Sequence, residues 1–213
     1  LIAGFPAGPW GTNCFVVATG PGQECIVIDP GKDAMPGVDE VVREHHLQPV
    51  AVLVTHGHLD HMWSVTPVCE ARDVPAYIHP ADRHLLADPM AGISGDTRLM
   101  FEQMTGGRLQ FAEPDDVRPL DDRTDVDLAG LRLRVRHAPG HTPGSTVFLT
   151  DAEAFQRLRL RRFDRKSQFA GQGFTGHAQP RRDIAELMAV VKAGARASPS
   201  AGSNIHPTAA SMP

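Results

Sequence analysis

The sequence predicts an α/β protein in which helices cover layered sheets, and three observations support this fold class. Short apolar runs rich in β-branched residues alternate with helical patterns early in the chain, and several strand patterns then follow one another up to about residue 150. No apolar run approaches the roughly 18 residues that a membrane span needs. At 213 residues the chain is long enough for one sizeable domain. We expect residues 1–195 to form this domain and residues 196–213, which contain few core residues, to be a disordered tail.

The individual elements are predicted from local patterns, in chain order. A buried strand ends in the Asp29-Pro30-Gly31 turn, and valines at helical spacing follow it. A second β-branched run precedes a helix that tolerates Pro67 within its first turns. From residue 131, leucine and valine alternate with arginine, which indicates a strand with one solvated face. The expected strands are residues 25–28, 50–55, 75–80, 131–137 and 145–150, and the expected helices are residues 37–47 and 61–73.

The most specific signal follows the second strand, where His56, His58, Asp60 and His61 stand within six positions. In an extended segment residues two apart point the same way, so the first three side chains would project to one side. If a helix begins at Asp60, His61 returns toward the same point. Imidazole and carboxylate groups that converge on a loop suit a zinc-like ion and leave it open to a substrate. The alternative, a surface loop that is rich in histidine by chance, is disfavoured by this density of metal-binding residue types.

A second candidate ligand, His141, lies far along the chain. Pro139 and Gly140 predict a tight turn that would deliver its imidazole to a cleft from a separate strand. His141 is a weak signal alone, but it gains weight from the first motif. Asp29 either orients a ligand histidine or caps its own turn. Five other histidines have no such pattern and are expected to be solvated or structural: His45, His46, His79, His84 and His137.

Four segments carry a resemblance to a known family. THGHLDH at residues 55–61 resembles the metal-binding signature of the metallo-β-lactamase superfamily, and the strand and turn at residues 26–31 resemble the same family. HAPGHTPGS at residues 137–145 is similar to a loop of the glyoxalase II-like (hydroxyacylglutathione hydrolase-like) thioester hydrolases, and residues 4–17 fit bacterial members of that subgroup. The resemblance covers about residues 1–150 and implies an αββα sandwich with a dinuclear metal site.

The resemblance also implies a role for each candidate ligand. His56, His58 and His141 would hold the first metal, and Asp60 and His61 would belong to the second. The implied cofactor is zinc, as one or two ions, with iron or manganese as alternatives. The implied reaction is hydrolysis of a thioester, such as an acylglutathione, by attack of a metal-bound hydroxide. Asp60 would be the catalytic residue, because it would orient the water or accept its proton.

The chain departs from the family's pattern after about residue 150. The family's next strand ends in a Phe-Thr-Gly-Asp-Ser-Leu-Phe sequence whose aspartate bridges both metals, and the nearest match, RFDRKSQFAG, has Lys166 at that position. An ammonium group cannot bridge two cations, so we expect a weak or empty second site unless Asp164 substitutes. His206 is a candidate for the family's last histidine ligand. Residues 183–195 resemble an amphipathic helix, and natural divergence and a frameshifted C-terminal end both stay open.

Three other functions on the same scaffold stay open, namely a single-iron sulfur dioxygenase, a non-catalytic protein with a degraded site, and a nuclease. Residues 151–213 carry ten of the 21 basic residues but five of the 25 acidic ones, and residues 157–166 are basic enough to bind phosphate. The first 150 residues are correspondingly acidic, and the aromatic content of 6% leaves few platforms for stacking bases. We therefore expect a small-molecule substrate and no nucleic-acid partner.

The compartment is predicted from the N-terminus and the cysteines. The first 11 residues lack the basic segment of a secretory signal, and three cysteines cannot all pair: Cys14, Cys25 and Cys69. Together with the missing apolar span, this predicts a cytoplasmic protein with free thiols and no membrane partner. The pattern predicts no particular oligomeric state.

Overall fold

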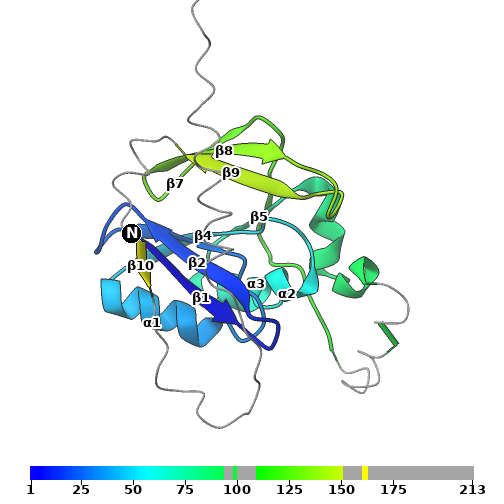
Figure 1. Ribbon diagram of the computed structural model, residues 1–213, viewed down its shortest axis with the longest axis horizontal. Coiled ribbons are helices and arrows are strands. Elements are labelled where there is room, and N and C mark those ends of the chain that lie inside the picture. Colours follow the sequence, from blue (N-terminus) through cyan, green and yellow to red (C-terminus); the bar gives the residue numbers. More distant parts are fainter. Residues whose placement is uncertain (94–97, 100–108, 151–159, 163–213) are drawn as a thin grey trace, which may run out of the picture.

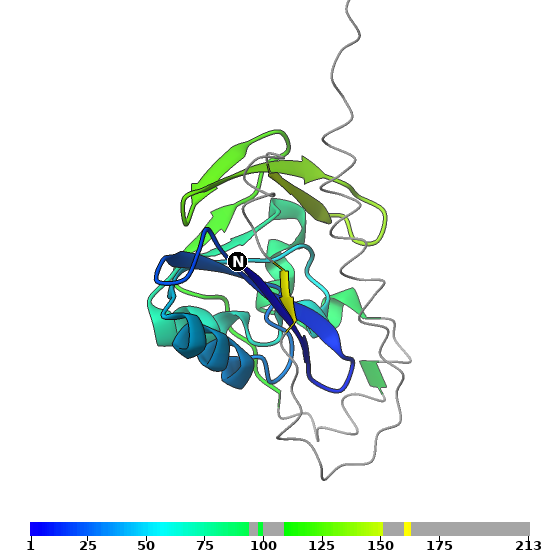
Figure 2. The ribbon, with the colours of Figure 1, turned by 60° about the vertical axis from the view of Figure 1, so that its left-hand side comes forward.

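Two stacked sheets form the framework of the computed structural model, which describes residues 1–93, 98–99, 109–150 and 160–162 (Figures 1 and 2). The larger sheet has seven strands in the order β10-β1-β2-β3-β4-β5-β6, and the smaller has three in the order β7-β8-β9. The strands are β1 Ile2–Ala7, β2 Thr12–Ala18, β3 Glu24–Ile28, β4 Gln48–Leu53, β5 Ala76–Ile78, β6 Val117–Pro119, β7 Asp125–Leu128, β8 Leu131–His137, β9 Thr146–Thr150 and β10 Leu160–Arg162. The helices are α1 Met35–His45, α2 Leu59–Met62 and α3 Val65–Arg72, with 3₁₀ helices η1 Pro80–Leu86 and η2 Pro89–Gly92.

The larger sheet is buried on both faces. On β3, Cys25 and Val27 pack with α1 and α3, whereas Ile26 and Ile28 pack with the three-stranded sheet. Successive side chains of a strand point to opposite faces, so one short apolar run contributes to two cores. The helices, the larger sheet and the smaller sheet are three successive layers of the expected αββα sandwich. The predicted helix at residues 183–195 lies outside the described residues.

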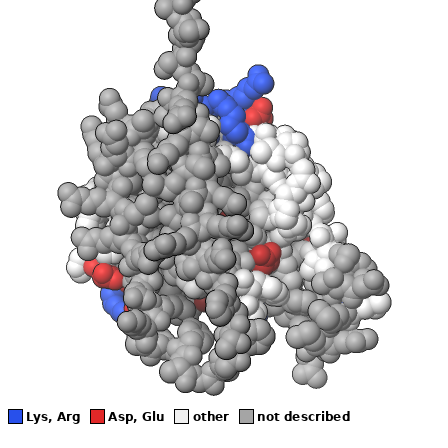
Figure 3. All heavy atoms as spheres, viewed as in Figure 1, with Lys and Arg blue, Asp and Glu red and all other residues white. Residues whose placement is uncertain are grey.

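Strand β8 has the predicted solvated face. Leu131, Leu133 and Val135 are buried against the larger sheet, and the arginines between them are exposed. Arg132 pairs with Asp127 of β7 at 2.9 Å. Figure 3 shows basic and acidic side chains next to one another at the top of the molecule, over this sheet. The arginines of β8 therefore lie among carboxylates of a neighbouring strand.

The expected helix at residues 61–73 is two helices in the structure. Helix α2 ends at Met62, and α3 begins at Val65. Pro67 is then the third residue of α3, where its missing N–H costs no hydrogen bond within the helix. Among the described residues, no helix combines the length and apolar character needed to cross a membrane.

Strands β3, β4 and β5 are parallel neighbours, so their carboxyl ends meet at one edge of the larger sheet. Asp29 follows β3, the segment from Thr55 to His58 follows β4, and His79 begins the turn into η1 after β5. Ligand and catalytic sites of open α/β sheets lie at such carboxyl ends. The loop between β8 and β9 reaches the same edge from the smaller sheet, because Thr146 N–H donates to the Thr55 carbonyl at 2.8 Å.

All three cysteines are buried and free. Burial raises the pKa of the Cys25 and Cys69 thiols to about 12, and it also raises the pKa of Cys14. A raised pKa keeps the thiol protonated and unreactive. We expect dithionitrobenzoate at pH 8 to react negligibly with the native protein within minutes and with three thiols after unfolding without reductant. A single reactive thiol in the unfolded, unreduced protein would indicate a disulfide and contradict the structure.

Candidate metal centre

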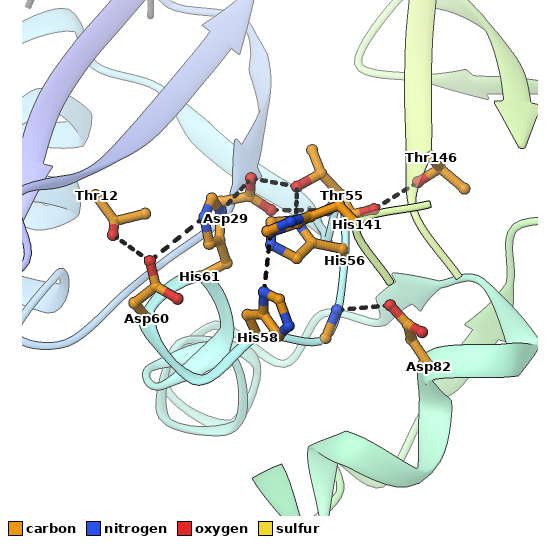
Figure 4. A network of polar contacts seen from close by, with 11 residues as sticks. Thr12, Asp29, Thr55, His56, His58, Asp60, His61, Asp82, His141 and Thr146 are labelled. Carbon is orange, nitrogen blue, oxygen red and sulfur yellow. Dashed lines mark hydrogen bonds and ion pairs between the residues drawn. The ribbon is translucent and has the colours of Figure 1, made fainter. Parts of the chain in front are cut away.

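Three of the predicted ligands meet at the carboxyl-end edge of the larger sheet. His56 and His58 follow β4, and His141 lies in the loop between β8 and β9 (Figure 4). One ring nitrogen from each lies within 4.8 Å of the others, which makes this a group that could hold a metal ion. The ligands come from both sheets, so the centre exists only when the sheets are stacked.

Each ring nitrogen of His56 has a different environment. Thr55 donates its hydroxyl hydrogen to Asp29 at 2.7 Å, so the same hydroxyl oxygen must accept the contact of 3.0 Å from His56 Nδ1–H. The proton on Nδ1 leaves Nε2 with a lone pair. This Nε2 is buried and has no hydrogen-bond partner among the residues that the structure describes. A buried polar atom without a partner is costly, and a bound ion removes that cost.

The protonation of the centre also suits a cation. Burial, followed by repulsion from His61, lowers the pKa of His56 to about 4, and burial and His141 lower the pKa of His58. Both imidazoles are then neutral at pH 7, as metal ligands must be. His58 Nδ1 and His141 Nε2 lie 3.0 Å apart, so both rings direct a nitrogen into the same space. Three imidazoles with an open fourth position are a donor set of catalytic zinc sites, and these residues fit a divalent metal.

Asp60 and His61 lie beside the three histidines but outside their cluster. The His61 ring centroid is 4.1 Å from that of His56, and His61 Nε2 is 3.5 Å from Asp60 Oδ2. Thr12 of β2 donates to the same carboxylate oxygen at 2.7 Å. These two residues are the described part of the expected second site, whereas Asp164, Lys166 and His206 lie outside the described residues.

Asp29 has the first of the two roles considered for it, because its side chain contacts the histidine segment. Its carboxylate contacts His61 Nδ1 at 3.0 Å and accepts from the Thr55 amide at 2.8 Å. Burial opposes the charge on His61, but the hydrogen bond that its Nδ1–H donates to Asp29 and the charges of Asp29 and Asp60 raise its pKa overall. Asp29 also adopts a left-handed backbone with φ 50°, which aspartate tolerates better than most residues. It therefore shapes the turn and orients His61 and, through Thr55, His56.

A carboxylate that the sequence patterns did not identify connects the two ligand loops. Asp82 in η1 is fully buried and accepts hydrogen bonds from Gly57, between two of the ligands, and from Gly144, beyond the third. The sequence signal that could have identified Asp82 is its position soon after the carboxyl end of β5, because the residues of the site lie at that edge of the sheet.

The five other histidines that the structure describes do not join the cluster. His79 and His137 stack with centroids 4.0 Å apart, and His137 Nε2 contacts the Pro143 carbonyl at 2.7 Å. His45 is buried in α1, His46 ends that helix with φ 53°, and His84 is exposed. Their positions agree with structural or solvated roles.

Aromatic side chains surround the segments that hold Asp60. Trp10 and Trp63 have ring centroids 6.0 Å apart, and Phe111 lies edge-on to Trp63 at 5.2 Å. Lys32 Nζ is 5.4 Å from the Trp63 centroid. Trp10 is 46% exposed, so this aromatic group presents an apolar surface close in sequence to Thr12, whose hydroxyl donates to Asp60.

Comparison with protein families and curated proteins agrees with the resemblance seen in the sequence. A family model described as the metallo-beta-lactamase superfamily matches residues 7–153. Uncharacterized protein Rv2581c of Mycobacterium tuberculosis (strain ATCC 25618 / H37Rv) is 39% identical over 186 residues, which are 87% of this chain and 78% of that protein. A hydroxyacylglutathione hydrolase of Nitrosomonas europaea is 31% identical over 124 residues, which are 57% of this chain and 36% of that enzyme.

Solved structures confirm the predicted metallo-β-lactamase fold. The B3 metallo-beta-lactamase BLEG-1 is 32% identical, with a TM-score of 0.59 over 72% of this chain and 68% of that chain. TTHA1623, determined in a di-iron-bound form, is 31% identical, with a TM-score of 0.51 over 67% of this chain and 64% of that chain.

Proposed function

The chain belongs to the metallo-beta-lactamase superfamily, and we propose that it is a metal-dependent hydrolase of a thioester such as an acylglutathione. The observation that carries the metal-dependent part is the convergence of His56, His58 and His141, with a buried Nε2 that has no hydrogen-bond partner. Support for a thioester comes from the loop at residues 137–145 and from the partial match with hydroxyacylglutathione hydrolases.

The proposed first metal ligands are His56, His58 and His141, with Asp60 and His61 on the side of the second metal. A bound divalent metal lowers the pKa of a water ligand from about 15.7 to about 7 and polarises a carbonyl. Thr12 holds the Asp60 carboxylate by a hydrogen bond, and that carboxylate orients the attacking water and accepts its proton. Asp29 and Thr55 keep the proton of His56 on Nδ1, which leaves Nε2 for the metal.

Zinc is the proposed metal, because imidazole nitrogens and a carboxylate suit it. The same donors suit iron, and TTHA1623 holds two iron ions. We propose that the first site is filled and that the second is weaker, since Lys166 stands where the family has its bridging aspartate. Metal analysis after loading with Zn²⁺, Mn²⁺ or Fe²⁺ measures both the identity and the number of ions.

Hydrolysis of a β-lactam amide is the second candidate function. The observation in its favour is the similarity to BLEG-1, which is higher in coverage than the similarity to the hydroxyacylglutathione hydrolase.

An assay of the metal-loaded protein separates these functions. We expect an acylglutathione to be hydrolysed with a kcat/KM at least about tenfold above that of a chromogenic cephalosporin, with no activity in the metal-free protein. Cleavage of a phosphodiester tests for a nuclease. Oxygen uptake with a glutathione persulfide tests for a sulfur dioxygenase. Faster cleavage of the cephalosporin would replace the thioester proposal, and inactivity on all four substrates would support a non-catalytic protein.

A further inference from the structure

The buried carboxylate of Asp82 lies between the two loops that carry the histidines. Asp82 belongs to the first turn of η1, which begins directly after β5, and its exposed fraction is 0%. A short helix that follows a central strand is a rigid support. The carboxylate is therefore held in place by an element that contributes no histidine to the metal-ligand cluster.

The contacts of Asp82 reach both loops. Oδ2 accepts from the Gly57 amide at 2.8 Å and from the Thr142 hydroxyl at 2.6 Å, and Oδ1 accepts from the Gly144 amide at 2.7 Å. Gly57 stands between His56 and His58, and Thr142 is the neighbour of His141. One side chain thus holds the backbone on both sides of the cluster.

The Gly144 backbone approaches Asp82 more closely than any other residue type would allow, and the Gly57 backbone approaches Leu85 of the same helix as closely. A Cβ atom on Gly144 would lie 2.5 Å from Asp82 Cγ, and one on Gly57 would lie 3.2 Å from Asp82 Cβ and 2.5 Å from Leu85 Cδ1. Glycine is thus required at residue 144, where the backbone meets this carboxylate, and at residue 57, where the backbone meets Leu85 beside it, which indicates a built contact.

We propose that Asp82 is a positioning residue of the metal centre: it sets the spacing between the imidazoles of His56 and His58 and the imidazole of His141. The two loops extend from different sheets, so their separation is not determined by the chain between them. Besides Asp82, Thr146 also connects the two segments. Its amide and its hydroxyl donate to the Thr55 carbonyl at 2.8 and 3.0 Å. The inference rests on the proposed histidine metal site, but it is independent of the substrate.

The test is Asp82→Asn, measured by zinc affinity in chelator competition and by the visible spectrum of the Co²⁺-loaded protein. An asparagine has one acceptor oxygen in place of two, so at least one amide beside a ligand loses its partner. We expect zinc to bind about 10- to 100-fold more weakly, as for other residues that orient ligands, and the Co²⁺ spectrum to change. Thr142→Val removes one of the three contacts and should weaken zinc binding and change the Co²⁺ spectrum to a smaller extent. This variant tests the positioning role of Asp82 if Asp82→Asn does not fold.

The control is Val38→Ala, which opens a cavity in the helix-side core far from these loops. It should lower the thermal midpoint of the metal-free protein and leave zinc affinity and the Co²⁺ spectrum unaltered. The inference is overturned if Asp82→Asn and Thr142→Val also lower only the thermal midpoint. If the unaltered protein binds no zinc, the proposal of a metal site is wrong, and the inference about Asp82 is wrong with it. If the protein binds zinc but hydrolyses no thioester, only the proposed function is contradicted.

Discussion

Replacing His58 with alanine is expected to release the metal from the purified protein and to lower thioester turnover roughly 1,000-fold, because the metal supplies several kcal/mol of the rate enhancement. His58 provides one of three imidazole nitrogens that lie within 4.8 Å of one another. Two remaining imidazoles hold a divalent ion much more weakly. The measurements are metal content after desalting, by elemental analysis, and kcat/KM on an acylglutathione.

His84→Ala is the matched control for this variant. His84 carries the same side chain, is exposed and lies in η1 outside the cluster. We expect it to retain the metal content and turnover of the unaltered protein. A His58→Ala protein with full metal content would show that the three histidines are not the ligands.

Replacing Asp60 with asparagine has the second largest expected effect. The amide keeps the shape of the side chain and an oxygen for the Thr12 hydroxyl, but it loses the charge that accepts a proton from water. We expect kcat/KM to fall about 100- to 1,000-fold, while one metal ion per chain stays bound to the histidines. Turnover and metal stoichiometry are measured on the same preparation.

Asp88→Asn is the corresponding control, since Asp88 is exposed and its side chain caps no helix by a hydrogen bond. It should behave as the unaltered protein. If Asp60→Asn keeps full turnover, the carboxylate is not the proton acceptor, and if it loses all metal, Asp60 belongs to the first site.

Much of the fold was predictable because its signals are local. The expected strands at residues 25–28, 50–55, 131–137 and 145–150 match β3, β4, β8 and β9 within a few residues, since alternation and β-branching follow the backbone geometry of a strand. The β1–β2 hairpin was not predicted. Gly4 and Pro6 interrupt the apolar pattern of β1, and partners in the sheet compensate for those interruptions.

The sequence by itself determined which metal-binding residue types near β4 lie together. His56 and His58 lie two apart on extended backbone, and α2 begins at Leu59, so the spacing alone places Asp60 and His61 next to them. The same local spacing could not determine the third imidazole. His141 follows His58 by more than 80 positions, and it arrives only because the smaller sheet packs on the larger one.

Tertiary structure alone decided how the ligands are held. The proton on His56 Nδ1 depends on Asp29 and Thr55, which meet at the ends of two parallel strands. The spacing between the two histidine loops depends on Asp82, which comes from a third element. Local patterns describe what one segment buries or exposes, whereas these hydrogen bonds form between segments that are neighbours only after the strands have paired and the sheets have stacked.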